Sequence, residues 1–123
     1  MTDRNDDIAR LIRLPARHLR EELRPELQGR QAFLTLVAAN LLDGLARDVA
    51  TGGTAELDAA SRLEALLGVP HEEDVNVELC RLIESGVLDE RSPELMRHLR
   101  ETVLDLLAIE QPTYEAYRRE RPA

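Results

Sequence analysis

The chain has 123 residues and a formal net charge of −8; 33% of its residues are charged, 2% are aromatic and one is a cysteine. The acidic balance argues against nucleic-acid binding, which calls for a basic surface, and a single cysteine excludes an internal disulfide framework. No apolar run approaches the roughly 18 residues of a membrane span, and the polar N-terminus lacks the apolar core of a signal peptide. We therefore expect one cytoplasmic domain, residues 1–123, that binds neither nucleic acid nor membrane.

The N-terminal segment carries a helical pattern that a proline interrupts. We expect residues 1–7 to be frayed and the first helix to begin near Asp6 or Asp7, because acidic residues suit a helix N-terminus. Pro15 removes a backbone donor and disfavours helix at the preceding residue, which predicts either a kink or two short helices. Pro25 and Gly29 are expected to end this segment.

Residues 31–50 form the most apolar stretch and predict a central helix. Its apolar residues cover about half of the circumference, so the helix needs neighbours on more than one side. Gly52-Gly53 predicts its end. Asn40 lies beside the apolar arc: either it bonds to the domain's own loops, or it is left exposed beside an apolar groove and marks where a partner docks. The expected core stripe comprises Phe33, Val37, Leu41, Leu45 and Val49.

A third helix is expected directly after the glycine pair. Thr54 fits its N-cap position and Gly68 fits the C′ position beyond its end, which predicts a helix over about residues 54–67. Its expected core residues are Ala60, Leu63, Leu66 and Leu67.

Two more helices follow. Pro70 is expected to open the first of them, with residues 71–74 as an acidic first turn that the helix dipole favours, and Gly86 is expected to end it. Ser92 as N-cap and Pro93 at the first helical position begin the second. The expected core residues are Val75, Leu79, Leu82 and Ile83 in the first, and Leu95, Leu99, Val103, Leu106 and Leu107 in the second.

These patterns predict an all-α fold. No segment shows the alternation of a strand, and the connections are short, so sequential helices should be mostly antiparallel. We expect a small helical bundle of four main helices plus a kinked or split N-terminal helix. Residues 1–7 and 113–123 are expected to be peripheral, and the polar C-terminal tail either docks loosely or adds a short helix.

The first helix carries a row of arginines at spacings of three and four residues. They fall within an arc of roughly 80° beside the apolar face. Guanidinium groups bind carboxylates and phosphates with two hydrogen bonds, so the row is a candidate contact surface for an acidic partner or a phosphorylated ligand. The alternative is a solvated face paired with nearby glutamates. The candidate surface comprises Arg10, Arg13, Arg17, Arg20, Arg24 and Asn40.

Other chemically capable side chains form no recognisable site. The pentapeptide Arg-His-Leu-Arg-Glu occurs at residues 17–21 and 97–101, but the pattern directs His18 and His98 away from the core, where a bundle metal site would need them. Cys80 is expected to be a buried, inert thiol. The chain lacks a phosphate loop, a nucleophile elbow and a CxxC pair. We therefore expect no enzyme activity, no catalytic residues, no metal and no cofactor.

Four stretches together resemble a known family. They are LREELRPELQGRQAFLTLVAANLL (19–42), RLEALLG (62–68), NVELCRLIESGVLD (76–89) and HLRETVLDLLAIEQPTY (98–114). The chain resembles, over residues 8–114, a family of small bacterial proteins classed as a domain of unknown function. The genes of that family typically lie beside those of an aminoglycoside-phosphotransferase-like kinase and an acyl-CoA dehydrogenase.

The resemblance implies a role beside the kinase, which is thought to phosphorylate hydroxyacyl-CoA substrates. The expected function is that of a non-catalytic accessory subunit of the kinase in hydroxyacyl-CoA catabolism. One alternative is a small bundle that holds an acyl-CoA or another phosphorylated ligand through the arginine row. Another is a self-associating helical protein, a homo-oligomer. The resemblance carries no catalytic residues to this chain.

Overall fold

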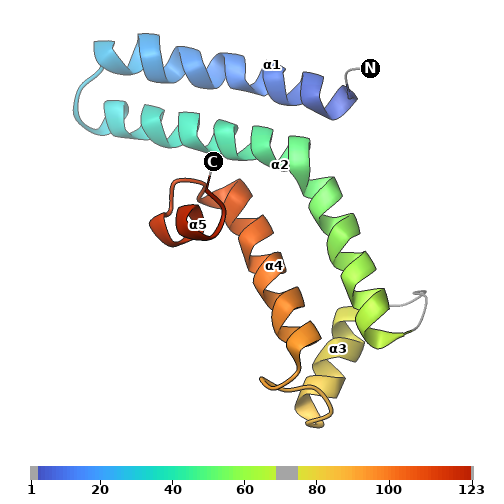
Figure 1. Ribbon diagram of the computed structural model, residues 1–123. Helices are drawn as coiled ribbons and strands as arrows, with labels where there is room; N and C mark the ends of the chain where they lie inside the picture. The colour runs from blue at the N-terminus through green and yellow to red at the C-terminus, as the bar shows by residue number, and fades with distance from the viewer. Residues whose placement is uncertain (1–2, 69–74, 123) are drawn as a thin grey trace. The chain divides into compact units, whose positions relative to one another are not determined.

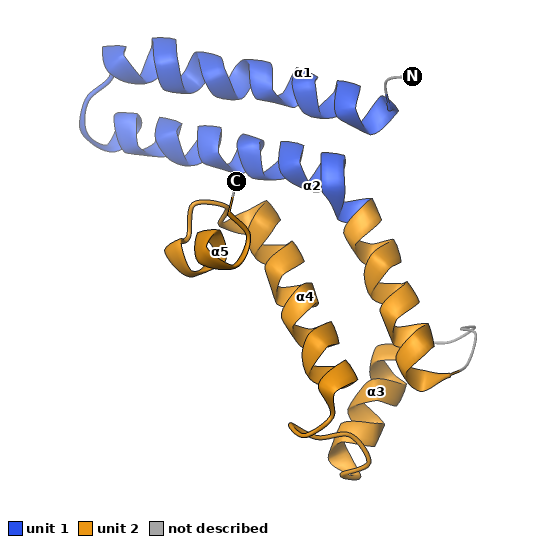
Figure 2. Ribbon diagram, viewed as in Figure 1, with its two compact units in different colours: residues 1–53 blue, residues 54–123 orange. Residues whose placement is uncertain are grey.

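The computed structural model describes residues 3–68 and 75–122, and helices account for most of them (Figure 1). The described part contains five α-helices and no strand, which confirms the all-α prediction. The helices are α1 (Arg4–His18), α2 (Gly29–Leu67), α3 (Val75–Glu84), α4 (Pro93–Glu110) and α5 (Glu115–Glu120). The chain divides into two compact units, residues 1–53 and residues 54–123, which Figure 2 colours separately. The bundle arrangement stays a prediction.

Unit 1 begins with α1, which starts slightly earlier than predicted. Asp3 caps the helix: its side chain accepts a hydrogen bond from the backbone N–H of Asn5 at 3.2 Å. The helix runs through Pro15 as one element, so a split at that residue is excluded, whereas the predicted kink stays a prediction. A π turn (Leu19–Leu23) and a 3-10 turn (Arg24–Glu26) then lead to α2.

Alanines mark the side on which the two helices of unit 1 meet. α1 and the first part of α2 lie side by side and antiparallel (Figure 1). The fully buried residues of the pair are Ala9 and Ala16 in α1 and Ala39 and Ala46 in α2. On each helix they are seven residues apart, so they share one side, and small side chains let two helix backbones approach closely.

This alanine side of α2 corrects the predicted core stripe. Phe33, Leu41 and Leu45 are 63%, 65% and 54% exposed, because they lie on the opposite side of the helix from Ala39 and Ala46. We call the exposed side the α2 apolar face. It consists of Phe33, Leu34, Val37, Leu41 and Leu45.

The glycine pair does not end α2, which is another correction. The helix continues through Gly52-Gly53, so Thr54 is an interior residue and not an N-cap. Neither glycine has a positive φ. An interior glycine disfavours a helix by about 1 kcal/mol relative to alanine, which favourable flanking residues can override.

Unit 2 contains the end of α2 together with α3, α4 and α5, and several predicted boundaries are confirmed there. Gly68 follows α2 with φ +72°, and its N–H donates to the Glu64 carbonyl at 2.8 Å, as a C′ glycine does. Gly86 follows α3 with φ +81°. Ser92 is the N-cap of α4 and Pro93 its first residue. The predicted helix start at Pro70 and the acidic turn at residues 71–74 lie outside the described residues.

The apolar core of unit 2 joins α2, α3 and α4. It contains Leu63, Val75, Leu79 and Leu95, all of them predicted core residues, with Leu66, Leu67 and Leu88 packed against them. The predicted helix faces are wrong in detail. Cys80 and Ile83 are exposed on α3, as are Leu99, Val103 and Leu106 on α4. The buried residues of α4 are Leu95, His98 and Leu104, so its buried side is rotated relative to the predicted stripe.

Candidate interaction surface

The arginine row of unit 1 contains one side chain, Arg20, that contacts α2. Arg20 lies in the π turn after α1, and its Nη2 donates to Asn40 Oδ1 at 2.8 Å and pairs with Asp43 Oδ2 at 2.7 Å. The Arg20 and Asp43 side chains are 35% and 25% exposed. Both contacts involve a charged group, and such bonds are stronger than neutral ones. The structure thus brings together two of the predicted site residues, Arg20 and Asn40.

The neighbouring residues of the same turn pair locally. Arg17 Nε donates to Glu21 Oε2 at 3.0 Å, and this bond raises the pKa of Arg17 above its usual value. His18 Nδ1 lies 3.0 Å from Glu22 Oε2. Both pairs are exposed to solvent and join residues four apart on the same turn, so they contribute little to stability.

Three arginines of the row remain available to a partner. Arg10, Arg13 and Arg24 are exposed, and none of them forms an ion pair with any described residue. Arg10 and Arg13 share one side of α1. Arg24 belongs to the 3-10 turn, beyond a π turn that changes the residue spacing, so the predicted single arc does not extend to it. These three side chains form an exposed basic surface on an acidic chain.

Unit 2 holds a second polar cluster, which the sequence analysis missed. Arg62 Nε donates to His98 Nδ1 at 3.4 Å, and its Nη2 donates to Thr102 Oγ1 at 3.3 Å. Arg121 Nη1 donates to Asp105 Oδ1 at 2.8 Å, and its Nη2 donates to Glu101 Oε2 at 2.7 Å. Arg100 and Glu120 also form an ion pair. The cluster joins α2, α4 and the C-terminal segment.

His98 is buried within this cluster, contrary to the prediction that it faces away from the core. Its exposed fraction is 5%. Burial, and secondly the positive charge of Arg62, lower the pKa of His98. Because Nδ1 accepts from Arg62, the neutral imidazole carries its proton on Nε2. The polar positions His98, Thr102 and Asp105 follow a helical spacing of four and three, and this spacing is the signal that could have revealed the cluster.

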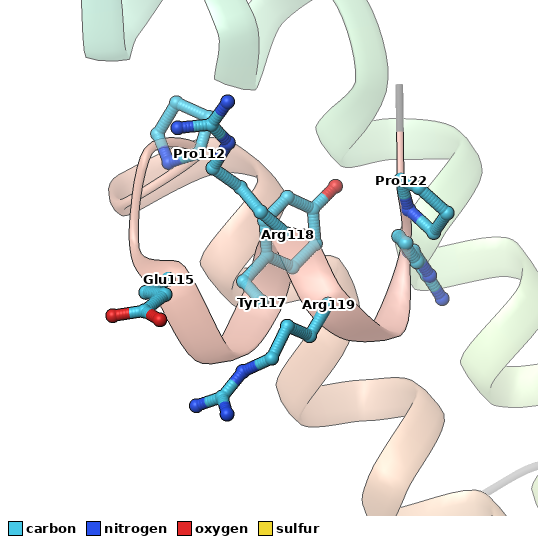
Figure 3. Close-up of a pocket in the computed structure, with 7 residues that line it drawn as sticks. Pro112, Glu115, Tyr117, Arg118, Arg119 and Pro122 are labelled. Carbon is cyan, nitrogen blue, oxygen red and sulfur yellow. The ribbon is translucent and has the colours of Figure 1, made fainter.

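Described residues of unit 2 line at least two hollows. One, of about 220 Å³, is lined by Arg62, Ala65, Leu66, Glu94, Arg97 and His98. The other, of about 600 Å³, surrounds the C-terminal helix and is lined by Pro112, Glu115, Tyr117, Arg118, Arg119, Arg121 and Pro122. In Figure 3, Arg118 and Arg119 point in opposite directions from α5, so they do not converge on one anion. Hydrogen bonding to Asp105, the largest influence, raises the pKa of Arg121 and occupies its guanidinium within the cluster.

The described residues contain no group of three or more His, Cys, Asp or Glu side chains that could hold a metal ion. Nor does any helix in residues 3–68 and 75–122 have both the length and the apolarity to cross a membrane.

Comparison with known protein families gives a match. A family model described as "Domain of unknown function (DUF6285)" matches residues 25–114. This range includes Asn40, Asp43 and most of unit 2, whereas Arg20, which contacts Asn40 and Asp43, and the rest of the arginine row precede it. No curated protein and no solved structure matches the chain.

Proposed function

The chain belongs to the DUF6285 family, and from this premise we propose that it is a non-catalytic accessory subunit of an aminoglycoside-phosphotransferase-like kinase in hydroxyacyl-CoA catabolism. The observation that carries the proposal is the basic surface of unit 1. Arg10, Arg13 and Arg24 are exposed and form no ion pair with a described residue, while Arg20 of the π turn contacts Asn40 and Asp43 of α2. The family resemblance supplies the identity of this partner. The basic surface of unit 1 would complement an acidic patch on it.

The pairing of the arginines favours a protein partner over a phosphorylated small molecule. A phosphate is gripped best by guanidinium groups that converge on it with free donors. Arg17 and Arg20 already donate to Glu21, Asn40 and Asp43, and these acceptors compete with a ligand. A protein surface, by contrast, needs only complementary charge spread along a helix.

Co-purification with the neighbouring kinase tests the proposal. The kinase and this chain are co-expressed, and one of them carries an affinity tag. We expect a stable complex that Arg10→Glu with Arg13→Glu weakens, because two attractive charges become repulsive. Arg118→Glu with Arg119→Glu is the matched control, since it changes the same charge on exposed residues of unit 2.

The proposal fails if the two proteins never associate and kinase activity is indifferent to this chain. Titration of an acyl-CoA against the isolated protein distinguishes the alternative of a ligand-binding bundle. Micromolar binding that Arg17→Ala and Arg20→Ala abolish would favour that alternative.

A further inference from the structure

The α2 apolar face leaves large side chains exposed on one side of a single helix. Phe33, Leu41 and Leu45 are more than half exposed, and Leu34 is also exposed. With Val37 they fall within about 120° of the helix circumference, opposite the buried alanines. A contiguous apolar surface of this kind on a soluble helix usually marks an interaction site.

Opposite charges bracket this face. Arg30 precedes it and Asp48 follows it, and both are exposed. They are eighteen residues apart, which corresponds to about five helical turns and about 27 Å along the axis, so they lie on the same line of the helix surface. Neither residue forms an ion pair with any described residue. The charges are therefore available to a partner that covers the face.

The residues along the α2 apolar face match those of a second, antiparallel copy of the same face. When a second copy of α2 lies antiparallel across the face, Arg30 of one copy lies opposite Asp48 of the other, at both ends. In the same register, Phe33 lies opposite Leu45 and Val37 opposite Leu41. Leu34 then faces Gly44, which has no side chain to obstruct it. A parallel pairing would instead place Arg30 opposite Arg30 and Asp48 opposite Asp48, which repel each other.

We propose that this chain forms a two-fold symmetric dimer through the α2 apolar face, with the two α2 helices antiparallel and Arg30 of each copy paired with Asp48 of the other. A two-fold axis repeats every contact, so the single ion pair becomes two and each apolar contact is made twice. The proposal goes beyond the accessory role and uses a different surface from the arginine row. Its test needs only the purified 123-residue chain, without the kinase, so the two proposals fail independently.

A charge exchange tests both the dimer and its orientation. Sedimentation equilibrium of the wild-type protein at micromolar concentrations is expected to show a monomer–dimer equilibrium. Arg30→Asp and Asp48→Arg each turn two attractive pairs into two repulsive ones, so each should raise the dissociation constant roughly tenfold or more. The double variant, Arg30→Asp with Asp48→Arg, restores both pairs and is expected to restore the wild-type dissociation constant.

A second pair of variants tests the apolar contact. Leu41→Glu places a charge at the middle of the face and is expected to abolish the dimer, while Leu57→Glu, at an equally exposed leucine outside the face, should leave it intact. Far-ultraviolet circular dichroism confirms that each variant keeps its helices. A monomeric wild-type protein throughout the micromolar range overturns the proposal. A double charge variant no better than the single ones overturns the antiparallel pairing.

Discussion

Replacing Gly53 with alanine tests whether α2 is continuous through the glycine pair. Gly53 is an interior helical residue without a positive φ, and an added Cβ would meet no heavy atom within 4 Å. Glycine in a helix interior is less stable than alanine by about 0.5–1 kcal/mol, because it loses more backbone freedom on folding. The free energy of unfolding should rise by that amount, and the Tm by roughly 2–5 °C for a chain of this size. Urea denaturation followed by circular dichroism measures the change.

Gly86→Ala is the matched control, since its added Cβ also has no neighbour within 4 Å. The two sites differ in backbone conformation: Gly86 has φ +81°. A left-handed conformation disfavours an L-residue by roughly 1–2 kcal/mol, so this variant should lose about 1 kcal/mol of stability. If Gly53→Ala is also destabilised, α2 does not continue through residues 52 and 53 as a helix, and the reasoning is refuted.

Three further predictions follow from the polar contacts. Burial lowers the pKa of His98 below the unfolded-state value of about 6.5. The neutral imidazole therefore contributes stability above about pH 6.5, and this contribution is lost as the pH falls through the lower pKa of the folded state. His98→Gln should flatten this acid limb in urea titrations at several pH values; an unchanged limb would contradict the assignment. A double-mutant cycle with Arg20→Ala and Asn40→Ala should give a coupling energy of about 0.5–1 kcal/mol in the free energy of unfolding, because the two side chains share a charged hydrogen bond. Strictly additive losses of stability would show that the two side chains do not interact. Arg121→Ala removes two partly exposed ion pairs, so it should lower the free energy of unfolding by about 1 kcal/mol and speed trypsin cleavage of the C-terminal segment. Unchanged cleavage would mean that these pairs do not hold the C-terminal segment in place.

Helix ends in unit 2 could be predicted from the sequence because their signals are local. Gly68 and Gly86 adopt the positive φ that favours glycine after a helix, and the Ser92-Pro93 pair begins α4. Each signal depends on one or two residues and their own backbone geometry. Tertiary contacts therefore did not need to be known.

The glycine pair shows where local signals mislead. Gly52 and Gly53 together disfavour a helix by only about 1–2 kcal/mol, which favourable flanking residues can offset. A glycine ends a helix only where the chain also turns into a positive φ, and the sequence does not reveal which glycines do so. Nor does the sequence reveal which side of a helix is buried. His98 is buried beside Arg62, and this neighbour depends on the fold.

Half of the candidate surface was visible in the sequence and half was not. The row of arginines follows from spacing alone. The contact between Arg20 and Asn40 joins residues twenty positions apart, and it exists only because α1 and α2 pack antiparallel after a π turn. The spacing assigns Arg17 and Arg20 the same role. In the structure, Arg20 contacts α2, whereas Arg17 pairs with Glu21 one turn further along its own segment.

The apolar surface of α2 is wide because one side of the helix packs against α1 and the opposite side is exposed. Ala39 and Ala46 pack toward α1, and residues 33–45 of the opposite side form the exposed face. Because α1 occupies the alanine side, a second copy on the apolar face would approach away from α1 and leave Arg10 and Arg13 accessible. The proposed dimer would then present two basic surfaces related by a two-fold axis. A partner that is itself two-fold symmetric could engage both at once, and such bivalent binding gains affinity without any new contact.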